Sequence, residues 1–447
     1  MRVRMEAWED DRNCRLRRRV VNDSALARRD ASCIKDIMPQ IHPTLTLDPN
    51  VNKESIAQLA DKPVLVPGLY VHIPFCFHKC HYCDFYSITA QTPERMERFV
   101  SLLLREARMW KEHSPATVRP RTVFFGGGTP SLLPLENMRS LLRGLREIFD
   151  LSNCNEWTVE ANPATVNLEY CQMLRDEGVN RMSFGAQSFD RAELAMLERH
   201  HDPDDLPRSV ELARSAGFER LNVDLIFGIP GQSMDSWSRS LEQAIALGLE
   251  HMSCYGLTYE PNTPMGVKKR LGVIQAVEEE LELEMLRHVR KRLAEAGLPA
   301  YEISNYARPG AECRHNLLYW AGDDYAALGP SGASHIQGRR WRNRPHLGQW
   351  EAAIENGAIP AIDVENLSNL QRAGELAMLM LRTTRGIIWD DFTARTGLDA
   401  RVNFARQIEE LSKMGLLDRD TASVRLSAKG LAVGDSVAAE FVISTDR

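Results

Sequence analysis

The sequence predicts an α/β fold in which a TIM-like (β/α) barrel, complete or partial, precedes a small C-terminal α+β domain. From Gly68 to about Gly266, short apolar runs alternate with amphipathic helical patterns, which is typical of βα units on a parallel sheet. Polar residues follow five of the six predicted strands, as expected where a barrel builds a site at its carboxyl ends. The predicted strands begin at Leu69, Thr122, Glu156, Arg181, Leu221 and His251.

The N-terminal segment differs from this pattern. Residues 1–37 are rich in arginine and lack apolar periodicity, and we expect a disordered extension over residues 1–60. A transit peptide is an alternative, but Asp10, Asp11 and Asp30 argue against it because such peptides are poor in acidic residues. Met38 is an alternative start of the chain.

Composition excludes several classes of protein. Nine cysteines in 447 residues do not indicate a disulfide-rich secreted scaffold, and the sequence contains no apolar run of membrane-spanning length. A net charge of −6 gives no overall basic surface for nucleic acid. We therefore expect a cytoplasmic protein with no transmembrane segment and no nucleic-acid partner.

Three cysteines lie close together after the first predicted strand. Cys76, Cys80 and Cys83 have the spacing C-x3-C-x2-C, which supplies three thiolates to a [4Fe–4S] cluster and leaves one iron open. Structural zinc is the alternative, with His78 or His81 as the fourth ligand. Most of the other cysteines are scattered and are interpreted as inert thiols.

The polar residues after the predicted strands form a candidate ligand site. They lie in Gly126-Gly-Gly-Thr129, at Glu160, in Gly185-Ala-Gln187, at Asp224 and at Thr258. Glycines permit close backbone approach, and carboxylates can accept hydrogen bonds from ribose hydroxyls or an amino group. Helix capping is the alternative explanation for each residue taken singly.

The cysteine motif with Tyr82, together with Gly126-Gly-Gly-Thr-Pro130, resembles the radical S-adenosylmethionine (SAM) superfamily. Further blocks narrow the resemblance to the oxygen-independent coproporphyrinogen III oxidase family and its HemW branch of haem chaperones. These blocks are Tyr70-Val-His-Ile-Pro-Phe-Cys76, Glu160-Ala-Asn-Pro163, Ser183-Phe-Gly-Ala-Gln-Ser-Phe189, Asp224-Leu-Ile-Phe-Gly-Ile-Pro-Gly-Gln232 and Tyr301-Glu-Ile-Ser-Asn-Tyr-Ala307.

The resemblance implies that the three cysteines hold the cluster and that a set of residues at the strand ends binds SAM. The implied SAM-binding residues are Tyr70, Tyr82, Gly127, Gly128, Thr129, Glu160, Gln187, Arg199, Asp224 and Thr258. In this superfamily, SAM chelates the open iron and is cleaved by one electron from the cluster.

Two features favour the chaperone branch over the oxidases. Phe85 stands where the oxidases have a further cysteine, and their N-terminal Pro-Arg-Tyr-Thr-Ser-Tyr-Pro block is missing before Tyr70. The motif His315-Asn316-x-x-Tyr319-Trp320 matches one associated with haem binding in this branch. From the residues alone, the alternative is that Tyr319 and Trp320 are core aromatics and His315 is a hydrogen-bonded loop residue. Cys313, and His335 in a glycine-rich turn, are further candidates to bind haem iron.

The C-terminal part changes to a different pattern. Helices over Asn369 to Arg382 and Ala400 to Met414, a strand from Ser423 and a helix from Ala428 predict a winged-helix-like domain. Its charges are nearly balanced, which argues against DNA binding. The resemblance implies that it covers the open mouth of the barrel. The expected domains are a barrel core at 61–300, a connecting segment with the haem motif at 301–364 and a HemN-type domain at 365–447.

Together these observations predict a haem chaperone that passes haem to an unidentified acceptor protein, with a [4Fe–4S] cluster and SAM as cofactors. The first alternative is an oxygen-independent coproporphyrinogen III oxidase, an enzyme that decarboxylates the propionates of its substrate. The second is a zinc-stabilised binding module without an iron–sulfur chromophore.

Overall fold

The structure is a computed structural model that describes residues 64–89, 91–114 and 116–443. The extension expected over residues 1–60 and the alternative start at Met38 lie outside the described residues. No helix within the described part of the chain is both long and apolar enough to cross a membrane.

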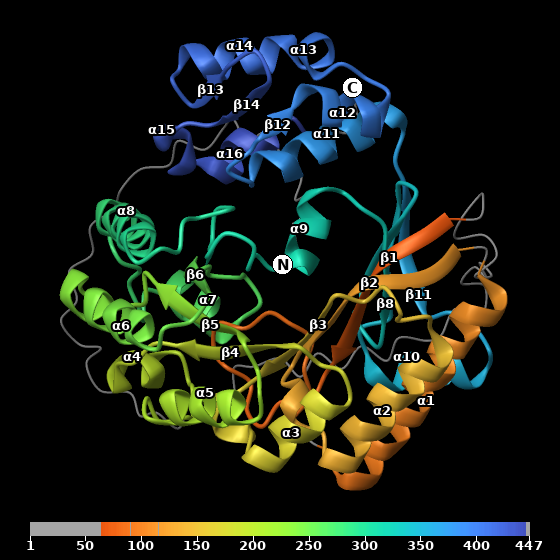
Figure 1. Cartoon of the computed structure of the whole chain (residues 1–447). Coiled ribbons are helices and arrows are strands. Elements are labelled where there is room, and N and C mark those ends of the chain that lie inside the picture. The colour runs from red at the N-terminus through yellow and green to blue at the C-terminus, as the bar shows by residue number, and fades with distance from the viewer. Residues whose placement is uncertain (1–63, 90, 115, 444–447) are drawn as a thin grey trace, which may run out of the picture. The chain divides into compact units, whose positions relative to one another are not determined.

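Six parallel strands form the centre of the main sheet, and they match the six predicted strands (Figure 1). They are β1 (Val64–Ile73), β2 (Ala116–Gly127), β3 (Glu156–Ala161), β4 (Arg181–Gln187), β5 (Arg220–Phe227) and β6 (His251–Gly256). The strand order is β1-β2-β3-β4-β5-β6, with each neighbouring pair parallel. The expected α/β fold is therefore confirmed.

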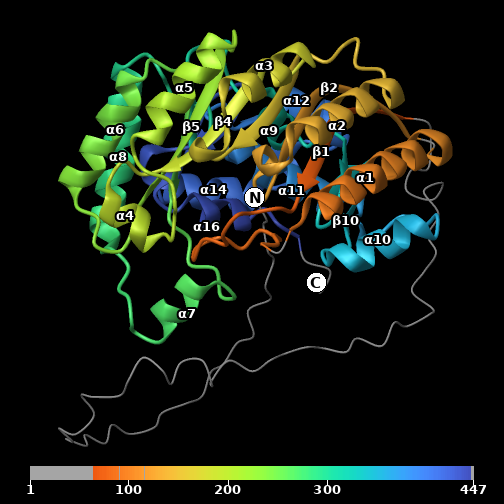
Figure 2. The same ribbon diagram turned by 90° about the horizontal axis from the view of Figure 1, so that it is seen from below.

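Helices connect these strands and pack on the sheet, and Figure 2 shows α1 to α3 running along one side of it. The helices are α1 (Pro93–His113), α2 (Leu135–Ile148), α3 (Leu168–Asp176), α4 (Arg191–Met196), α5 (Asp205–Ser215), α6 (Met234–Ala246), α7 (Pro264–Arg270) and α8 (Glu279–Glu295), with short 3-10 helices at Pro130–Leu132 and Pro163–Thr165. Several begin at a side-chain cap: Thr92 accepts from the Arg95 amide, and Ser233 and Ser236 form a capping box at α6.

The sheet continues beyond the six parallel strands on both sides. Its full order is β11-β10-β9-β8-β1-β2-β3-β4-β5-β6-β7, an open sheet with edges at β7 and β11, so the barrel is partial. The added elements are β7 (Asn305–Ala307), α9 (Arg314–Trp320), β8 (Tyr325–Leu328), β9 (Ala333–Ile336), β10 (Arg339–Asn343), α10 (Leu347–Glu355) and β11 (Ala361–Asn366). The segment expected to connect two domains therefore extends the main sheet, while the exact domain boundaries stay a prediction.

A separate three-stranded antiparallel sheet, of order β12-β14-β13, belongs to the small C-terminal domain, as expected for a winged-helix-like fold. Its elements are α11 (Asn369–Leu381), β12 (Ile387–Ile388), α12 (Trp389–Thr396), α13 (Ala400–Asn403), α14 (Ala405–Lys413), β13 (Leu417–Arg419), β14 (Ser423–Leu426), α15 (Ala428–Leu431) and α16 (Gly434–Ala439). It has its own apolar core, which includes Phe392, Phe404 and Phe441.

Three expectations about local structure are wrong. The single helix expected over Ala400 to Met414 is broken at Phe404, whose φ of −120° and ψ of 24° leave the helical region while its ring enters the core. His335 lies in strand β9 rather than in a glycine-rich turn.

The third of these expectations concerns the C-terminal domain. It meets the barrel beside Tyr301, where the Thr384 amide donates to the Tyr301 carbonyl at 3.0 Å. Tyr301 in turn contacts His251, the first residue of β6, so the described contact is at the amino ends of the strands and not at the expected mouth.

Candidate functional site

The cysteine loop follows β1 and is held closed at its base. The Cys76 amide donates to the Ile88 carbonyl at 2.9 Å, and the Ile88 amide donates to the Pro74 carbonyl at 2.8 Å. Cys76, Cys80 and Cys83 are half-buried free thiols on this loop. The Thr129 hydroxyl lies 3.8 Å from Cys76 Sγ and Arg199 Nη1 lies 3.7 Å from Cys80 Sγ, so these two sulfurs accept from neighbouring groups.

The environment of these thiols suits metal ligation. Burial raises the pKa of Cys76 and raises that of Cys83 to about 12, and the neighbouring cysteines add to both shifts. Thiols with raised pKa values stay protonated in the free protein, and a bound metal would displace the protons. Three sulfurs that influence one another from a single loop fit a [4Fe–4S] cluster with one open iron.

The glycine-rich turn after β2 packs directly against this loop. The Gly128 amide donates to the Ile73 carbonyl at 2.8 Å and the Thr129 amide donates to the Phe75 carbonyl at 2.7 Å. Gly127 has a φ of +109°, and a Cβ atom there would lie 2.6 Å from the His72 ring. Only glycine fits this position without strain, so the sequence motif holds the turn and the cysteine loop together.

Two carboxyl groups lie inside the barrel near the carboxyl ends of β3 and β5. Burial and, to a smaller extent, the charge of Asp224 raise the pKa of Glu160 to about 8. Burial likewise raises the pKa of Asp224, whose oxygens accept from Asn222 Nδ2 at 2.8 Å and Ser183 Oγ at 3.3 Å. The pKa of Tyr70 is raised by burial and by Glu160. This group of acceptors would suit a ligand that carries amino or hydroxyl donors.

Gln187 and Arg199 meet at the end of β4. Gln187 has a φ of +67°, and the pairing of β4 with β5 shifts register between Gly185 and Gln187. Arg199 donates to the Gly185 carbonyl, while its Nε is buried and has no hydrogen-bond partner in the part of the chain that the structure describes. An unpartnered guanidinium nitrogen beside a strained strand end is the kind of group that a ligand satisfies.

The last two residues of the expected SAM set lie in different surroundings. Tyr82 packs on a small apolar cluster that contains Leu197, Ile226 and Met265. Thr258 is exposed and lies two residues beyond the end of β6. Loop and strand-end residues of β1 to β5 therefore come together around the cysteine loop, whereas Thr258 lies on the surface.

The expected haem motif lies on α9, toward the opposite ends of the strands. His315 is fully buried; its Nδ1 lies 2.8 Å from the Thr122 hydroxyl and its Nε2 lies 2.8 Å from the Tyr319 hydroxyl. Its amide donates to Glu156 at 2.9 Å, and its ring stacks on Phe124. Burial lowers the pKa of His315 to about 4, which keeps the imidazole neutral. Because both ring nitrogens already have partners, His315 does not fit a haem iron in this conformation.

The other residues considered for haem are buried or half-buried. Trp320 is buried under the Arg382 guanidinium at 5.0 Å, and Asn316 is half-buried on the same helix. Cys313 is buried with its sulfur 3.4 Å from Glu156 Oε1, and burial raises its pKa to about 12. His335 lies 3.7 Å from Asp324 and is also buried.

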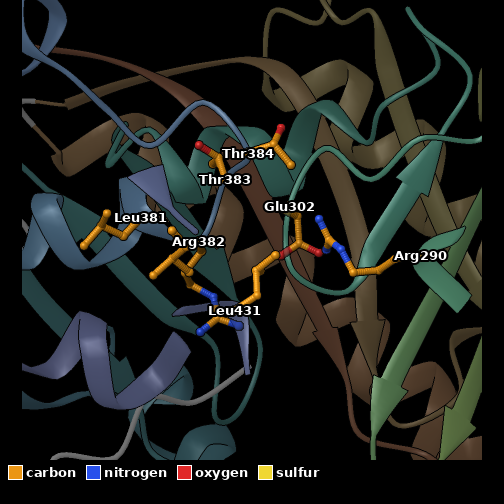
Figure 3. Close-up of a pocket in the computed structure, with 8 residues that line it drawn as sticks. Arg290, Glu302, Leu381, Arg382, Thr383, Thr384 and Leu431 are labelled. Carbon is orange, nitrogen blue, oxygen red and sulfur yellow. The ribbon is translucent and has the colours of Figure 1, made fainter. Parts of the chain in front are cut away.

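A pocket of about 190 Å³ lies where the barrel meets the C-terminal domain (Figure 3). It is lined by Arg290 and Glu302 on one side and by Leu381, Arg382, Thr383, Thr384, Leu426 and Leu431 on the other. Ligand pockets usually measure about 300–1,000 Å³, so this one is too small to enclose a porphyrin.

Sequence reasoning missed the polar network behind Asp224. Asn222 Nδ2 donates to Ser183 Oγ at 2.7 Å, and Asn222 Oδ1 lies 2.6 Å from His251 Nδ1. His251 Nε2 lies 2.8 Å from the Tyr301 hydroxyl. The available signal is the occurrence of polar residues at every second position of otherwise apolar strands, which marks the face that points into the barrel.

Two parts of the chain match known protein families. Residues 70–244 match the family model of the radical SAM superfamily, and residues 367–433 match that of the HemN C-terminal domain. The heme chaperone HemW of Lactococcus lactis is 32% identical over 84% of this chain and 97% of its own length. HemW of Escherichia coli is 38% identical over 59% of this chain and 68% of its own length.

Among solved structures, the coproporphyrinogen III oxidase HemN of Escherichia coli, described as a radical SAM enzyme, matches with a TM-score of 0.73. The match covers 87% of this chain and 92% of that chain at 22% identity, so it supports the fold alone.

The partial barrel and the cysteine loop define a protein of the radical SAM superfamily. Within that superfamily the chain belongs to the HemW family, whose curated members are named heme chaperones.

Proposed function

We propose that this protein is a haem chaperone that binds haem and transfers it to an acceptor protein. The observation that carries the proposal is its similarity to HemW of Lactococcus lactis, which extends over 97% of that protein. The exposed Phe85, at the position where the oxidases of the family have a further cysteine, supports the chaperone branch. The acceptor and the cytoplasmic location expected from the sequence stay predictions.

We propose that Cys76, Cys80 and Cys83 hold a [4Fe–4S] cluster, which when bound supplies one electron to SAM. Their burial and mutual influence support this role. The residues proposed to position SAM then act as a cradle: the Gly127 to Thr129 turn provides close backbone approach, and Glu160 and Asp224 provide acceptors. The raised pKa of Glu160 also allows its carboxyl to donate a proton in a hydrogen bond.

For haem, the motif on α9 stays a proposal that requires a conformational change. His315 would become an axial ligand only after its contacts with Thr122 or Tyr319 break and α9 moves from the barrel. Haem is then the transported substrate.

An anaerobic haem titration of the cluster-reconstituted protein, followed at the Soret band, tests the proposal. We expect saturation near one haem per chain, loss of binding in His315→Ala, and retained binding in Tyr319→Phe, which frees Nε2 without removing the imidazole. Equal binding by His315→Ala and the wild-type protein would exclude His315 as the ligand, and His335→Ala is then the next variant. No specific binding by the wild-type protein would overturn the carrier function.

The second candidate function is the decarboxylation of coproporphyrinogen III. The match of residues 367–433 to the family model of the HemN C-terminal domain is the observation that favours it. It predicts turnover of coproporphyrinogen III by the reconstituted protein with SAM and a reductant, and Cys76→Ala would abolish this turnover. A protein that binds haem but leaves coproporphyrinogen III unchanged would exclude it.

A further inference from the structure

A group of three side chains with metal-ligating atoms lies beside the cysteine loop. His78, Glu198 and His200 each place one ligand atom within 4.8 Å of the other two. His78 lies between two of the cluster cysteines in sequence, and Glu198 and His200 flank Arg199 in the segment between α4 and α5. None of the three belongs to the residues proposed for the cluster, SAM or haem.

The spacing of these atoms is close to that of a ligand set. His78 Nε2 lies 3.5 Å from Glu198 Oε2, and the rings of His78 and His200 have centroids 4.3 Å apart at 85°. Two ligands at about 2.0–2.1 Å from a tetrahedral zinc ion are themselves about 3.4 Å apart. The first pair therefore already has this spacing, and His200, which is exposed, can close the remaining gap by rotating its side chain.

The state of these atoms also points to a missing partner. His78 Nε2 is buried from solvent and makes no hydrogen bond within the described residues, although its side chain as a whole is 37% exposed. The Glu198 carboxylate oxygen lies 3.5 Å from this nitrogen and does not satisfy it as a hydrogen-bond acceptor. Burying an unsatisfied ring nitrogen is unfavourable, and a bound cation would satisfy it.

The carboxylate is positioned from its other side. Glu198 Oε1 lies 3.7 Å from His81 Nδ1, which lies 3.2 Å from Lys268 Nζ. Glu198 has a φ of +56°, a backbone conformation that costs about 1–3 kcal/mol for a residue other than glycine. Neighbours that fix the orientation of a ligand are a regular feature of metal sites.

We propose that His78, Glu198 and His200 form a second metal site for a divalent first-row transition ion of the Zn²⁺ or Fe²⁺ type. Two imidazoles and one carboxylate suit these ions, with a remaining position for water, whereas Mg²⁺ and Ca²⁺ prefer oxygen ligands alone. A bound ion would tie the cysteine loop to the segment that carries Arg199. The inference is independent of haem transfer.

The test is equilibrium dialysis of the anaerobically cluster-reconstituted full chain against Zn²⁺, with zinc and iron counted per chain. Other histidines and cysteines can bind zinc, so the difference between proteins is decisive. We expect His200→Ala and Glu198→Gln each to bind one zinc fewer per chain than the wild-type protein, with unchanged iron. His346→Ala, which removes an exposed histidine outside the group, should bind as the wild-type protein does.

X-ray absorption at the zinc edge provides a second measurement. Zinc in the proposed site would show only nitrogen and oxygen neighbours at about 2.0–2.1 Å, whereas zinc in a cysteine site would show sulfur at about 2.3 Å. Equal zinc content in the wild-type protein and both variants would overturn the proposal. So would sulfur neighbours around the zinc ion that the wild-type protein binds and the variants do not. The group would then be an ion pair between His78 and Glu198.

Discussion

The cysteine loop and helix α9 both carry motifs that point to a bound group, yet the structure treats their side chains differently. In the loop, Cys76 and Cys80 accept weak contacts at 3.8 and 3.7 Å, from Thr129 and Arg199. On α9, both ring nitrogens of His315 have protein partners at 2.8 Å. The two motifs also lie toward opposite ends of the parallel strands, because Thr129 follows β2 whereas Thr122 lies well before its end.

This difference separates a preformed site from a motif that first serves the fold. In a rigid, preformed site the ligating atoms have no strong partner before the ligand binds. This is unfavourable for folding, and the rest of the structure must compensate for it. Both ring nitrogens of His315 have hydrogen-bond partners within the protein. Its replacement should therefore lower stability even without haem. Variants of the cysteine loop should therefore lose the bound cluster, whereas variants of α9 should lose stability.

The largest expected effect is the loss of the cluster in Cys80→Ser. Removing one of three thiolates should reduce the iron content of the reconstituted protein to near zero and abolish its brown colour. Cys313→Ser is the matched control, since Cys313 is buried beside Glu156, and should keep its iron. Iron analysis and the absorption spectrum measure both. A Cys80→Ser protein with full iron content would contradict the assigned ligands.

His315→Ala should lower the free energy of unfolding of the cluster-free protein by about 2–4 kcal/mol, because Thr122 and Tyr319 lose a buried partner and a cavity forms. Tyr319→Phe should lower it by about 1 kcal/mol, since it removes one hydrogen bond and keeps the ring. Urea unfolding followed by circular dichroism measures both values. If His315→Ala unfolds at the wild-type urea concentration, the structural role assigned to the imidazole is wrong.

The cysteine loop and α9 also differ in how much of their structure could be predicted from the sequence. The six strands and the cysteine loop could be predicted, because their signals are local: apolar alternation and fixed spacing between Cys76 and Cys83. The burial of His315 could not, because it depends on Thr122 and Glu156, residues that are distant in the chain. The break at Phe404 was missed for a similar reason, since the core formed with Phe392 and Phe441 overrides helical periodicity.

Gly127→Ala sharpens the comparison within the cysteine region. A Cβ at this position would meet the His72 ring at 2.6 Å with the backbone at a φ of +109°. We expect a loss of about 2 kcal/mol in stability and weaker SAM binding by the cluster-loaded protein. Gly231→Ala is the control, because its φ of +82° imposes strain while no atom of the described residues lies within 4 Å of an added Cβ. It should cost about 1 kcal/mol and leave SAM binding unchanged. Calorimetric titration with SAM and urea unfolding check both; equal SAM affinity in Gly127→Ala would remove the turn from the site.

A further expected effect is a change in the pH dependence of stability. The pKa of Glu160 is about 8 in the folded chain, compared with an ordinary value of 4.5. Between these values the folded state holds a proton that the unfolded state has lost, so stability falls as the pH rises from about 4.5 to 8. Glu160→Gln removes this contribution, so its stability relative to the wild-type protein should rise steadily from pH 5 to pH 8.

Urea unfolding of the cluster-free protein at several pH values measures this trend, with Glu97→Gln on the exposed face of α1 as the control. The control should follow the wild-type protein at every pH. A constant difference between Glu160→Gln and the wild-type protein would mean that Glu160 ionises normally. Glu160 and Asp224 would then both be charged before any ligand binds. Two neighbouring carboxylates would favour a ligand with a charged amino group over one with a neutral donor.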